Sequence, residues 1–306
     1  MGKLIFRKPK EEDKYLMKEL FEEVFEGKYP LKEFFNPNNL EKVIKDKNHV
    51  GYLAFDKQEL VGCAIATLSY WNNSFEIGKT AVLKEYREEG IAKKLCFLAT
   101  EECFKLGLDV GIGRIRNDSI YKISEELKMI VTGFLPALFK ISEVETYLLS
   151  YRLCEKAKKK RVVNTNNPLY NAPVIKEITK QLNLEDQYGE LPKEVIVGSL
   201  GQNIKIKMDV LISNHSVYIQ NLDNLNFINK HYLQADLLID KLAEMEILKR
   251  FGFEICAFLP AWFEKKNKRY DCVRMVNSKT KPKMEGEVSN RILEDLIKKL
   301  GYRSPR

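Results

Sequence analysis

Residues 75–95 read FEIGKTAVLKEYREEGIAKKL, a strand-like run followed by a short loop and a helix-like run. The first part is rich in aromatic and β-branched residues and ends at Val82-Leu83, which predicts a strand. The loop carries Arg87-Glu88-Glu89-Gly90-Ile91-Ala92. Ile91 and Leu95 begin an apolar stripe at helical spacing, which predicts a helix that starts near Gly90.

The loop has the features of an anion-binding site. Gly90 and Ala92 are small, so another group can approach the backbone closely. Free N–H groups at the start of a helix, together with the helix dipole, suit a pyrophosphate. Basic residues close to the loop add positive charge: Arg87, Lys93 and Lys94. Glu88 and Glu89 are expected to face solvent as acidic residues of the first helical turn.

The flanking sequence predicts an α/β fold (α+β mixed sheet). A short strand near the start is followed by a helix over 11–25, and two strand-like runs are separated by Lys57-Gln58. Downstream, strands and helices alternate over residues 109–153. One strand and helix, a meander and a β-α-β-α-β alternation predict a mixed sheet with helices on both faces.

These features resemble those of the GNAT acyltransferases. The cofactor signature of that family is Gln/Arg-x-x-Gly-x-Gly/Ala directly after the fourth strand, and REEGIA fits it there. The opening IFRKPKEED, the hairpin VGYLAFDKQELVGCAIATL and the IRND–helix–strand run extend the resemblance over about residues 3–153. It implies a GNAT-like fold and an acyl-CoA-dependent N-acyltransferase without a metal, with acetyl-CoA as the default donor.

The resemblance also implies the cofactor-binding residues. The backbone of Val82 and Leu83 would hold the pantetheine arm. Backbone N–H groups would hold the pyrophosphate, and they belong to Arg87, Glu88, Glu89, Gly90, Ile91, Ala92 and Lys93. Asn117 matches an Asn that commonly contacts the cofactor, although it could instead cap a helix together with Asp118.

The resemblance assigns catalytic residues as well. Glu76, at the start of the fourth strand, occupies the usual place of a general base, and Phe75 and Ile77 could supply an apolar setting. The alternative interpretation is that Glu76 has no catalytic role and simply faces solvent from the strand. Ser124 stands where the family often has a Tyr that acts as general acid, and Tyr121, on the same helical face, is the alternative candidate.

An internal repeat marks the second half. Phe134-Leu135-Pro136-Ala137 recurs as Phe258-Leu259-Pro260-Ala261, and flanking elements fall in register at the same spacing, which indicates two tandem copies. In both copies the Pro is expected to interrupt the strand ladder. The loop positions of the first copy correspond to Leu211, Asn214 and Ser216, so the second copy is expected to bind no CoA. It is expected either to form one wall of the acceptor site or to pack on the first copy as a pseudo-dimer.

The predicted organisation is an acyl-CoA-binding domain over 1–154, a linker over 155–170 and a degenerate GNAT-like domain over 171–306. The linker is assigned because the composition of this segment shifts to Lys, Asn and Pro. The second half is expected to contain strands at 194–200, 204–212 and 216–221.

Composition describes a soluble globular chain of 306 residues, 44% hydrophobic and 31% charged. No apolar run reaches membrane-span length, and the start turns acidic where a signal peptide would be apolar, so a cytoplasmic location is expected. The six scattered cysteines favour reduced thiols. The net charge is +8, and much of the excess lies in two basic runs at 156–161 and 279–283. We interpret these runs as solvated loops or linkers. They lack the interleaved aromatic residues that are typical of nucleic-acid binding.

Three functions remain open at the level of sequence. The first is acetylation of a small-molecule amine by direct attack on the thioester in a ternary complex. The second is a protein or peptide acetyltransferase, which needs an open acceptor groove. The third is a non-catalytic CoA-binding sensor or assembly module, which the missing Tyr favours.

Overall fold

The computed structural model describes residues 4–29, 31–140, 144–164, 166–197, 232–278 and 280–303. The chain forms two compact units. The first comprises Met1–Arg114 with Ser119–Met129, and the second comprises Ile115–Asp118 with Ile130–Arg306. The boundary between the two units lies earlier in the chain than the domain boundary expected at residue 154. The predicted domain limits 1–154, 155–170 and 171–306 remain a prediction.

The first unit begins with β1 (Ile5–Arg7), the short 3-10 turn η1 (Glu11–Asp13) and α1 (Lys14–Phe25). It continues with η2 (Lys32–Phe35), α2 (Pro37–Lys45), β2 (His49–Asp56), β3 (Glu59–Ser69) and β4 (Ser74–Val82). After η3 (Lys84–Tyr86) come α3 (Ile91–Lys105), β5 (Val110–Ile115) and α4 (Asp118–Glu126).

The expected elements are present, and α2 is an addition to them. Its start carries a signal that could have been read from the sequence. The Asn36 side chain accepts from the N–H of Asn38 at 2.9 Å, and Pro37 occupies the first helical position.

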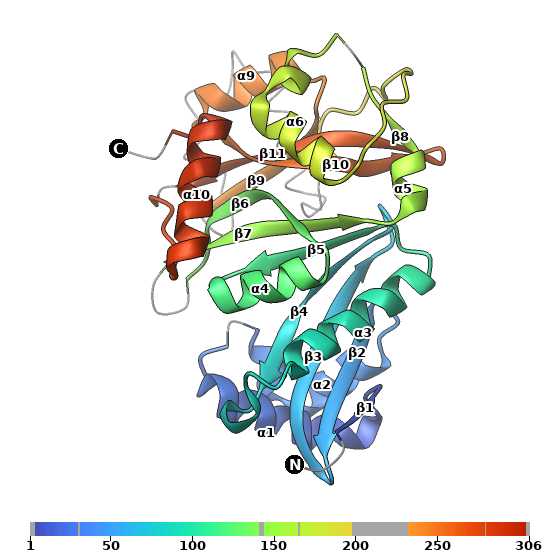
Figure 1. Cartoon of the computed structure of the whole chain (residues 1–306), viewed down its shortest axis with the longest axis vertical. Coiled ribbons are helices and arrows are strands. Elements are labelled where there is room, and N and C mark those ends of the chain that lie inside the picture. Colours follow the sequence, from blue (N-terminus) through green and yellow to red (C-terminus); the bar gives the residue numbers. More distant parts are fainter. Residues whose placement is uncertain are drawn as a thin grey trace. The chain divides into compact units, whose positions relative to one another are not determined.

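The strands of the first unit are ordered β1-β2-β3-β4-β5. Neighbours are antiparallel up to β4, and β4 pairs with β5 in parallel. The sheet is therefore mixed, as expected. Helix α3 lies across one face of the central strands, and α1 and α2 lie on the other face (Figure 1).

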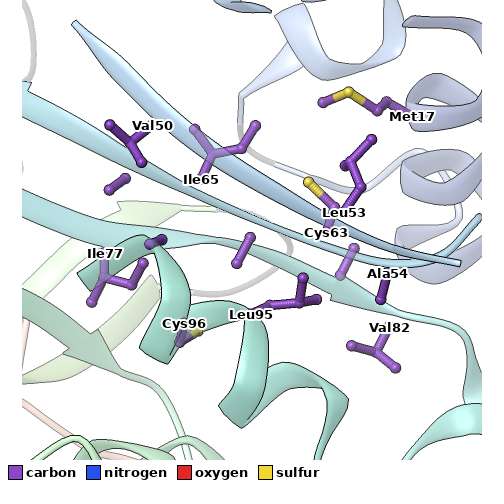
Figure 2. Packing of buried hydrophobic residues seen from close by; sticks show 14 of the residues in the cluster. Met17, Val50, Leu53, Ala54, Cys63, Ile65, Ile77, Val82, Leu95 and Cys96 are labelled. Carbon is purple, nitrogen blue, oxygen red and sulfur yellow. The ribbon is translucent and has the colours of Figure 1, made fainter. Parts of the chain in front are cut away.

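The core of the first unit fills both faces of its sheet. Figure 2 shows Met17 of α1 beside Leu53 and Cys63 on one side of the strands. Leu95 and Cys96 of α3 lie on the opposite side. Alternating strand residues are thus buried by different helices, which explains why β3 is apolar almost throughout.

Strands β4 and β5 separate halfway along β4. Their pairing runs from Ser74↔Val110 to Ile77↔Gly113, and no further pair joins them among the described residues. At the same place β4 bulges against β3, because the register shifts between Cys63↔Ala81 and Ile65↔Gly78. A bulge kinks a strand and increases its local twist, so the second half of β4 leaves its parallel neighbour.

The second unit contains β6 (Ile130–Lys140), β7 (Val144–Leu153), α5 (Glu155–Lys159), β8 (Arg161–Val162), η4 (Pro168–Asn171) and α6 (Pro173–Gln181). Towards the C-terminus follow β9 (Tyr232–Leu238), α9 (Leu242–Arg250), β10 (Glu254–Lys265), β11 (Lys268–Ser278) and α10 (Glu287–Leu300). The strand order is β7-β6-β10-β11-β8, and β9 also pairs with β11. The strands expected at 204–212 and 216–221, most of the one at 194–200, and the positions Leu211, Asn214 and Ser216 lie outside the described residues.

The basic run at 156–161 is not a solvated segment throughout, and this expectation is wrong at Arg161. The Arg161 side chain is fully buried and forms an ion pair with Asp271 at 2.6 Å. Its strand, β8, pairs in parallel with β11. Burial of the guanidinium is possible because a carboxylate that is equally buried neutralises it.

No helix in the described parts of the chain combines the length and the apolar character needed to cross a membrane. The six cysteines are all free thiols, and five of them are buried.

Candidate active site

The loop between β4 and α3 presents a row of unused backbone donors. Within the described chain, none of the N–H groups from Glu88 to Lys93 donates a hydrogen bond to another backbone or side-chain group. Glu88 and Gly90 both adopt left-handed backbone conformations, with φ of 72° and 73°. Left-handed residues in such a turn can gather successive N–H groups into a concave anion site. The amide of Arg87 differs, since it donates to the carbonyl of Lys84 at 3.3 Å.

Side chains around this loop are largely exposed. Lys93 forms an ion pair with Glu126 of α4 at 2.8 Å, which offsets part of its charge. The Nζ atom of Lys94 lies 5.8 Å from the centre of the Phe97 ring. Glu88 and Glu89 face solvent, as expected. Their expected place in the first helical turn is wrong, because Gly90 is the N-cap of α3 and both residues precede it.

Val82 and Leu83 differ in what their backbones can offer. Leu83 donates its N–H to Val61 at 3.0 Å, and its carbonyl accepts from Tyr86 at 3.1 Å. Its amide is therefore already bonded within the protein, and the expected contact of the Leu83 backbone with the pantetheine arm stays a prediction. Val82 is the partner of Gly62, and the Leu83–Val61 bond makes this a non-hydrogen-bonded pair. The polar backbone groups of Val82 accordingly point away from β3, and the Val82 carbonyl accepts from Nε of Arg87 at 3.4 Å.

Glu76 lies on the α1 face of β4, because its neighbour Phe75 packs against Phe104 of α3 on the other face. Its carboxylate forms an ion pair with Arg114 of β5, and its side chain is 27% exposed. The apolar setting expected from Phe75 and Ile77 is therefore wrong. Side chains alternate along a strand, so those two residues are buried on the α3 side while Glu76 meets a guanidinium.

Further polar residues accompany Glu76, and the sequence analysis missed them. Lys79 follows the bulge in β4 and has a φ of 48°. Burial lowers the pKa of its ammonium group, and Glu76, Glu33 and Arg114 are close enough to affect it. Tyr29, between α1 and η2, is held among aromatic rings, and burial raises its pKa.

These residues come from separate parts of the chain, and no spacing rule joins them. Lys79 alone carried a signal, because a lysine inside a strand is seldom buried unless it has a partner. Perturbed pKa values grouped in this way are typical of functional sites.

Ser124 and Tyr121 both lie on α4, in different environments. The Ser124 side chain is 5% exposed, and its Oγ atom has no hydrogen-bond partner among the residues that the structure describes. The Tyr121 hydroxyl donates to Glu125 at 2.9 Å on the same helix. A buried hydroxyl without a partner is costly in a folded protein, so Ser124 is the residue that a ligand could satisfy.

Asn117 follows β5 and is half-buried, within the short segment that belongs to the second unit. The alternative role of Asn117, as a helix cap together with Asp118, remains a prediction. The Asp118 carboxylate accepts from the N–H groups of Ser289 at 2.8 Å and Val288 at 3.3 Å, at the start of α10. These bonds lower the pKa of Asp118.

The first unit thus has a mixed sheet whose fourth and fifth strands separate, followed by a loop with unused backbone N–H groups at a helix start. Residues 14–117 match the family described as Acetyltransferase (GNAT) family. This segment is therefore a GNAT acetyltransferase domain, and the fold of the first unit is GNAT-like. The match covers about a third of the chain.

Solved structures with a similar fold are acetyltransferases. The ribosomal-protein-S5-alanine acetyltransferase from Vibrio fischeri is 15% identical, with a TM-score of 0.45 over 51% of this chain and 95% of its own. Aminoglycoside 6'-acetyltransferase type Ii is 17% identical, with a TM-score of 0.42 over 49% and 96%. The PaiA N-acetyltransferase from Thermoplasma acidophilum, in complex with coenzyme A, is 15% identical, with a TM-score of 0.40 over 50% and 99%. No curated protein sequence matches the chain.

Proposed function

We propose that this protein transfers an acetyl group from acetyl-CoA to the amine of a small molecule, by direct transfer in a ternary complex. The observation that carries the proposal is the row of unused N–H groups from Glu88 to Lys93, directly after the free edge of β4. A helix start with unpaired amides suits a pyrophosphate, and a free strand edge suits the amide-containing pantetheine arm.

The proposed cofactor site keeps the expected residues, with two changes of role. Backbone amides of Glu88, Glu89, Gly90, Ile91, Ala92 and Lys93 would bind the pyrophosphate. Arg87 would contribute its side-chain charge rather than its amide, and Val82 rather than Leu83 would meet the pantetheine arm. Asn117 stays a proposed cofactor contact.

The proposed reaction forms a nitrogen–carbon bond and breaks the carbon–sulfur bond of the thioester. The acceptor amine attacks the thioester carbonyl and loses one proton to Glu76, directly or through a water molecule. The CoA thiolate leaves and takes up one proton. Ser124 is the proposed donor of a hydrogen bond to sulfur, and its unpartnered Oγ supports this role. Tyr121 is the second candidate.

Replacing Glu76 with Gln is expected to lower kcat about 100-fold, because proton transfer by a positioned side chain contributes that much or more. The KM for acetyl-CoA should change little, since Glu76 lies on the α1 face of the sheet. Thiol release from acetyl-CoA in the presence of an amine panel measures both constants. The exposed Glu23 serves as a matched control as Glu23→Gln. A kcat within twofold of the parent protein would remove Glu76 from the role of base.

The same assay separates the alternatives. Stimulation by peptides but not by small amines would favour a protein or peptide acetyltransferase. Thiol release that no acceptor stimulates would favour a CoA-binding sensor or assembly module.

We further propose that the second half is a degenerate tandem copy and that the two copies form a pseudo-dimer. The hairpins β6–β7 and β10–β11 support this. Each shows two register shifts, and the larger one lies at the Phe-Leu-Pro-Ala sequence, between Leu135 and Phe139 in the first hairpin and between Leu259 and Phe263 in the second. Strands β6 and β10 also pair with each other, through Gly133 and Ala257, which are equivalent positions of the repeat.

The ungapped alignment of the repeat needs one correction. Phe139 pairs with Glu145, whereas the equivalent Phe263 pairs with Tyr270. The ungapped alignment of the two copies makes Glu145 equivalent to Arg269, not to Tyr270. The second hairpin is therefore one residue longer at its turn, and an alignment without gaps cannot show this. The domain limits 1–154, 155–170 and 171–306 and a cytoplasmic location remain part of the proposal.

A further inference from the structure

Lys79 is held on the same face of the first unit as the proposed base. It follows the bulge in β4, where the strand separates from β5. Its Nζ atom donates to the Thr67 hydroxyl at 2.5 Å. Thr67 is the register partner of Glu76, and directly paired residues project to the same face of a sheet. Lys79 and Glu76 therefore point to the same side, under the segment that carries Tyr29 and Glu33.

Not all of the charged groups on this face are paired directly within the described protein. Glu76 and Arg114 form an ion pair with each other. Lys79, by contrast, is bonded to a neutral hydroxyl and forms no ion pair in the described chain. Glu33, in η2, acts on Lys79 only through its electrostatic field and makes no hydrogen bond there. One cation and one carboxylate are thus left without direct partners of opposite charge.

A half-buried ammonium without an anionic partner is costly, and a ligand can supply that partner. A carboxylate bound there would be attracted more strongly than in water, since burial lowers the effective dielectric constant. In an amino acid the carboxylate and the amine are one carbon apart. The residue that binds the carboxylate must therefore lie close to the base that receives the proton of the amine. Lys79 lies on the same face of the sheet as the proposed base Glu76.

We propose that Lys79 binds a carboxylate of the acceptor, so that the acceptor is an amino acid or a small molecule with a carboxylate beside its amine. The inference rests on the proposed function, because it names the acceptor class of that site. Glu33 is placed to attract the acceptor ammonium before it is deprotonated.

The test compares amino acids with the amines that lack only the carboxylate. Suitable pairs are phenylalanine with phenethylamine, leucine with 3-methylbutylamine and alanine with ethylamine, each assayed by thiol release from acetyl-CoA. We expect kcat/KM to favour the amino acid by about 10- to 100-fold in at least one pair, as for a hydrogen bond between charged groups. Lys79→Met should abolish this preference through the KM of the amino acid, and Lys79→Arg should retain most of it.

Lys28→Met is the matched control, because Lys28 is exposed in the neighbouring loop and forms an ion pair with the exposed Glu26 at 3.5 Å. Circular dichroism and the KM for acetyl-CoA verify that each variant is folded. Turnover of amines without any preference for the carboxylate, or a preference that survives in Lys79→Met, would overturn the inference and leave the proposed function standing. If no acceptor stimulates thiol release, the proposed function fails and the inference fails with it.

Discussion

A Gly90→Glu variant is expected to lose coenzyme A binding while the protein stays folded. Gly90 caps α3 with a φ of 73°, and a side chain built there would meet no atom within 4 Å. The new carboxylate would therefore project into the space beside the free amides and compete with a pyrophosphate for them. Its negative charge would also repel the phosphates.

Calorimetric titration with coenzyme A should show an affinity at least about 100-fold lower, since several charged hydrogen bonds are lost together. Gly90→Asn is the matched control. Asparagine tolerates the left-handed conformation better than other residues and adds no charge, so strain alone would leave binding much less affected. If both variants bind coenzyme A as the parent does, the loop does not hold the pyrophosphate.

A Gly133→Ala variant is expected to destabilise the second unit strongly. The added Cβ would lie 2.2 Å from the Cβ of Ala257, 2.3 Å from the carbonyl oxygen of Cys256 and 2.4 Å from the Cα of Ala257. Two of these atoms belong to the backbone, so no side-chain rotation relieves the clash. Overpacking of this kind costs about 3 kcal/mol or more, and the strands β6 and β10 would have to separate.

Thermal unfolding should show the loss as a lower Tm, and hydrogen exchange should show faster exchange in peptides from β6 and β10. Gly78→Ala is the matched control, because Gly78 is also a strand residue but has open space where its Cβ would lie. It is expected to leave the Tm unchanged or slightly raised, since alanine restricts the unfolded chain. Equal Tm values for the two variants would contradict the close approach of the hairpins.

The structure of the loop was accessible from sequence because its determinants are local. Gly90 and Ala92 lie within one turn of the helix start, and the strand before them shows its own apolar pattern. The hydrogen bonding of the Leu83 backbone was not accessible from sequence, for the opposite reason. Its amide is used by Val61, and strand register between residues far apart decides that.

The setting of Glu76 shows the same limit. Its place in β4 follows from the strand pattern, but its partner Arg114 arrives from the next strand, which pairs in parallel after an intervening helix. Glu33 is close enough to Lys79 to act on its charge only because the chain places η2 on that face of the sheet. The repeat was visible in sequence, whereas the longer second turn required the pairing of Phe263 with Tyr270.

The amino-acid sequence alone determined most of the order of strands and helices in the first half, the small-residue loop before a helix and the recurrence of Phe-Leu-Pro-Ala. These features depend on side-chain periodicity and on neighbours within a few positions. Only the tertiary structure decided which backbone groups remain free, which charges are paired and that Gly133 lies against Ala257. Such properties depend on strand register and on the approach of distant segments, which local patterns leave undetermined.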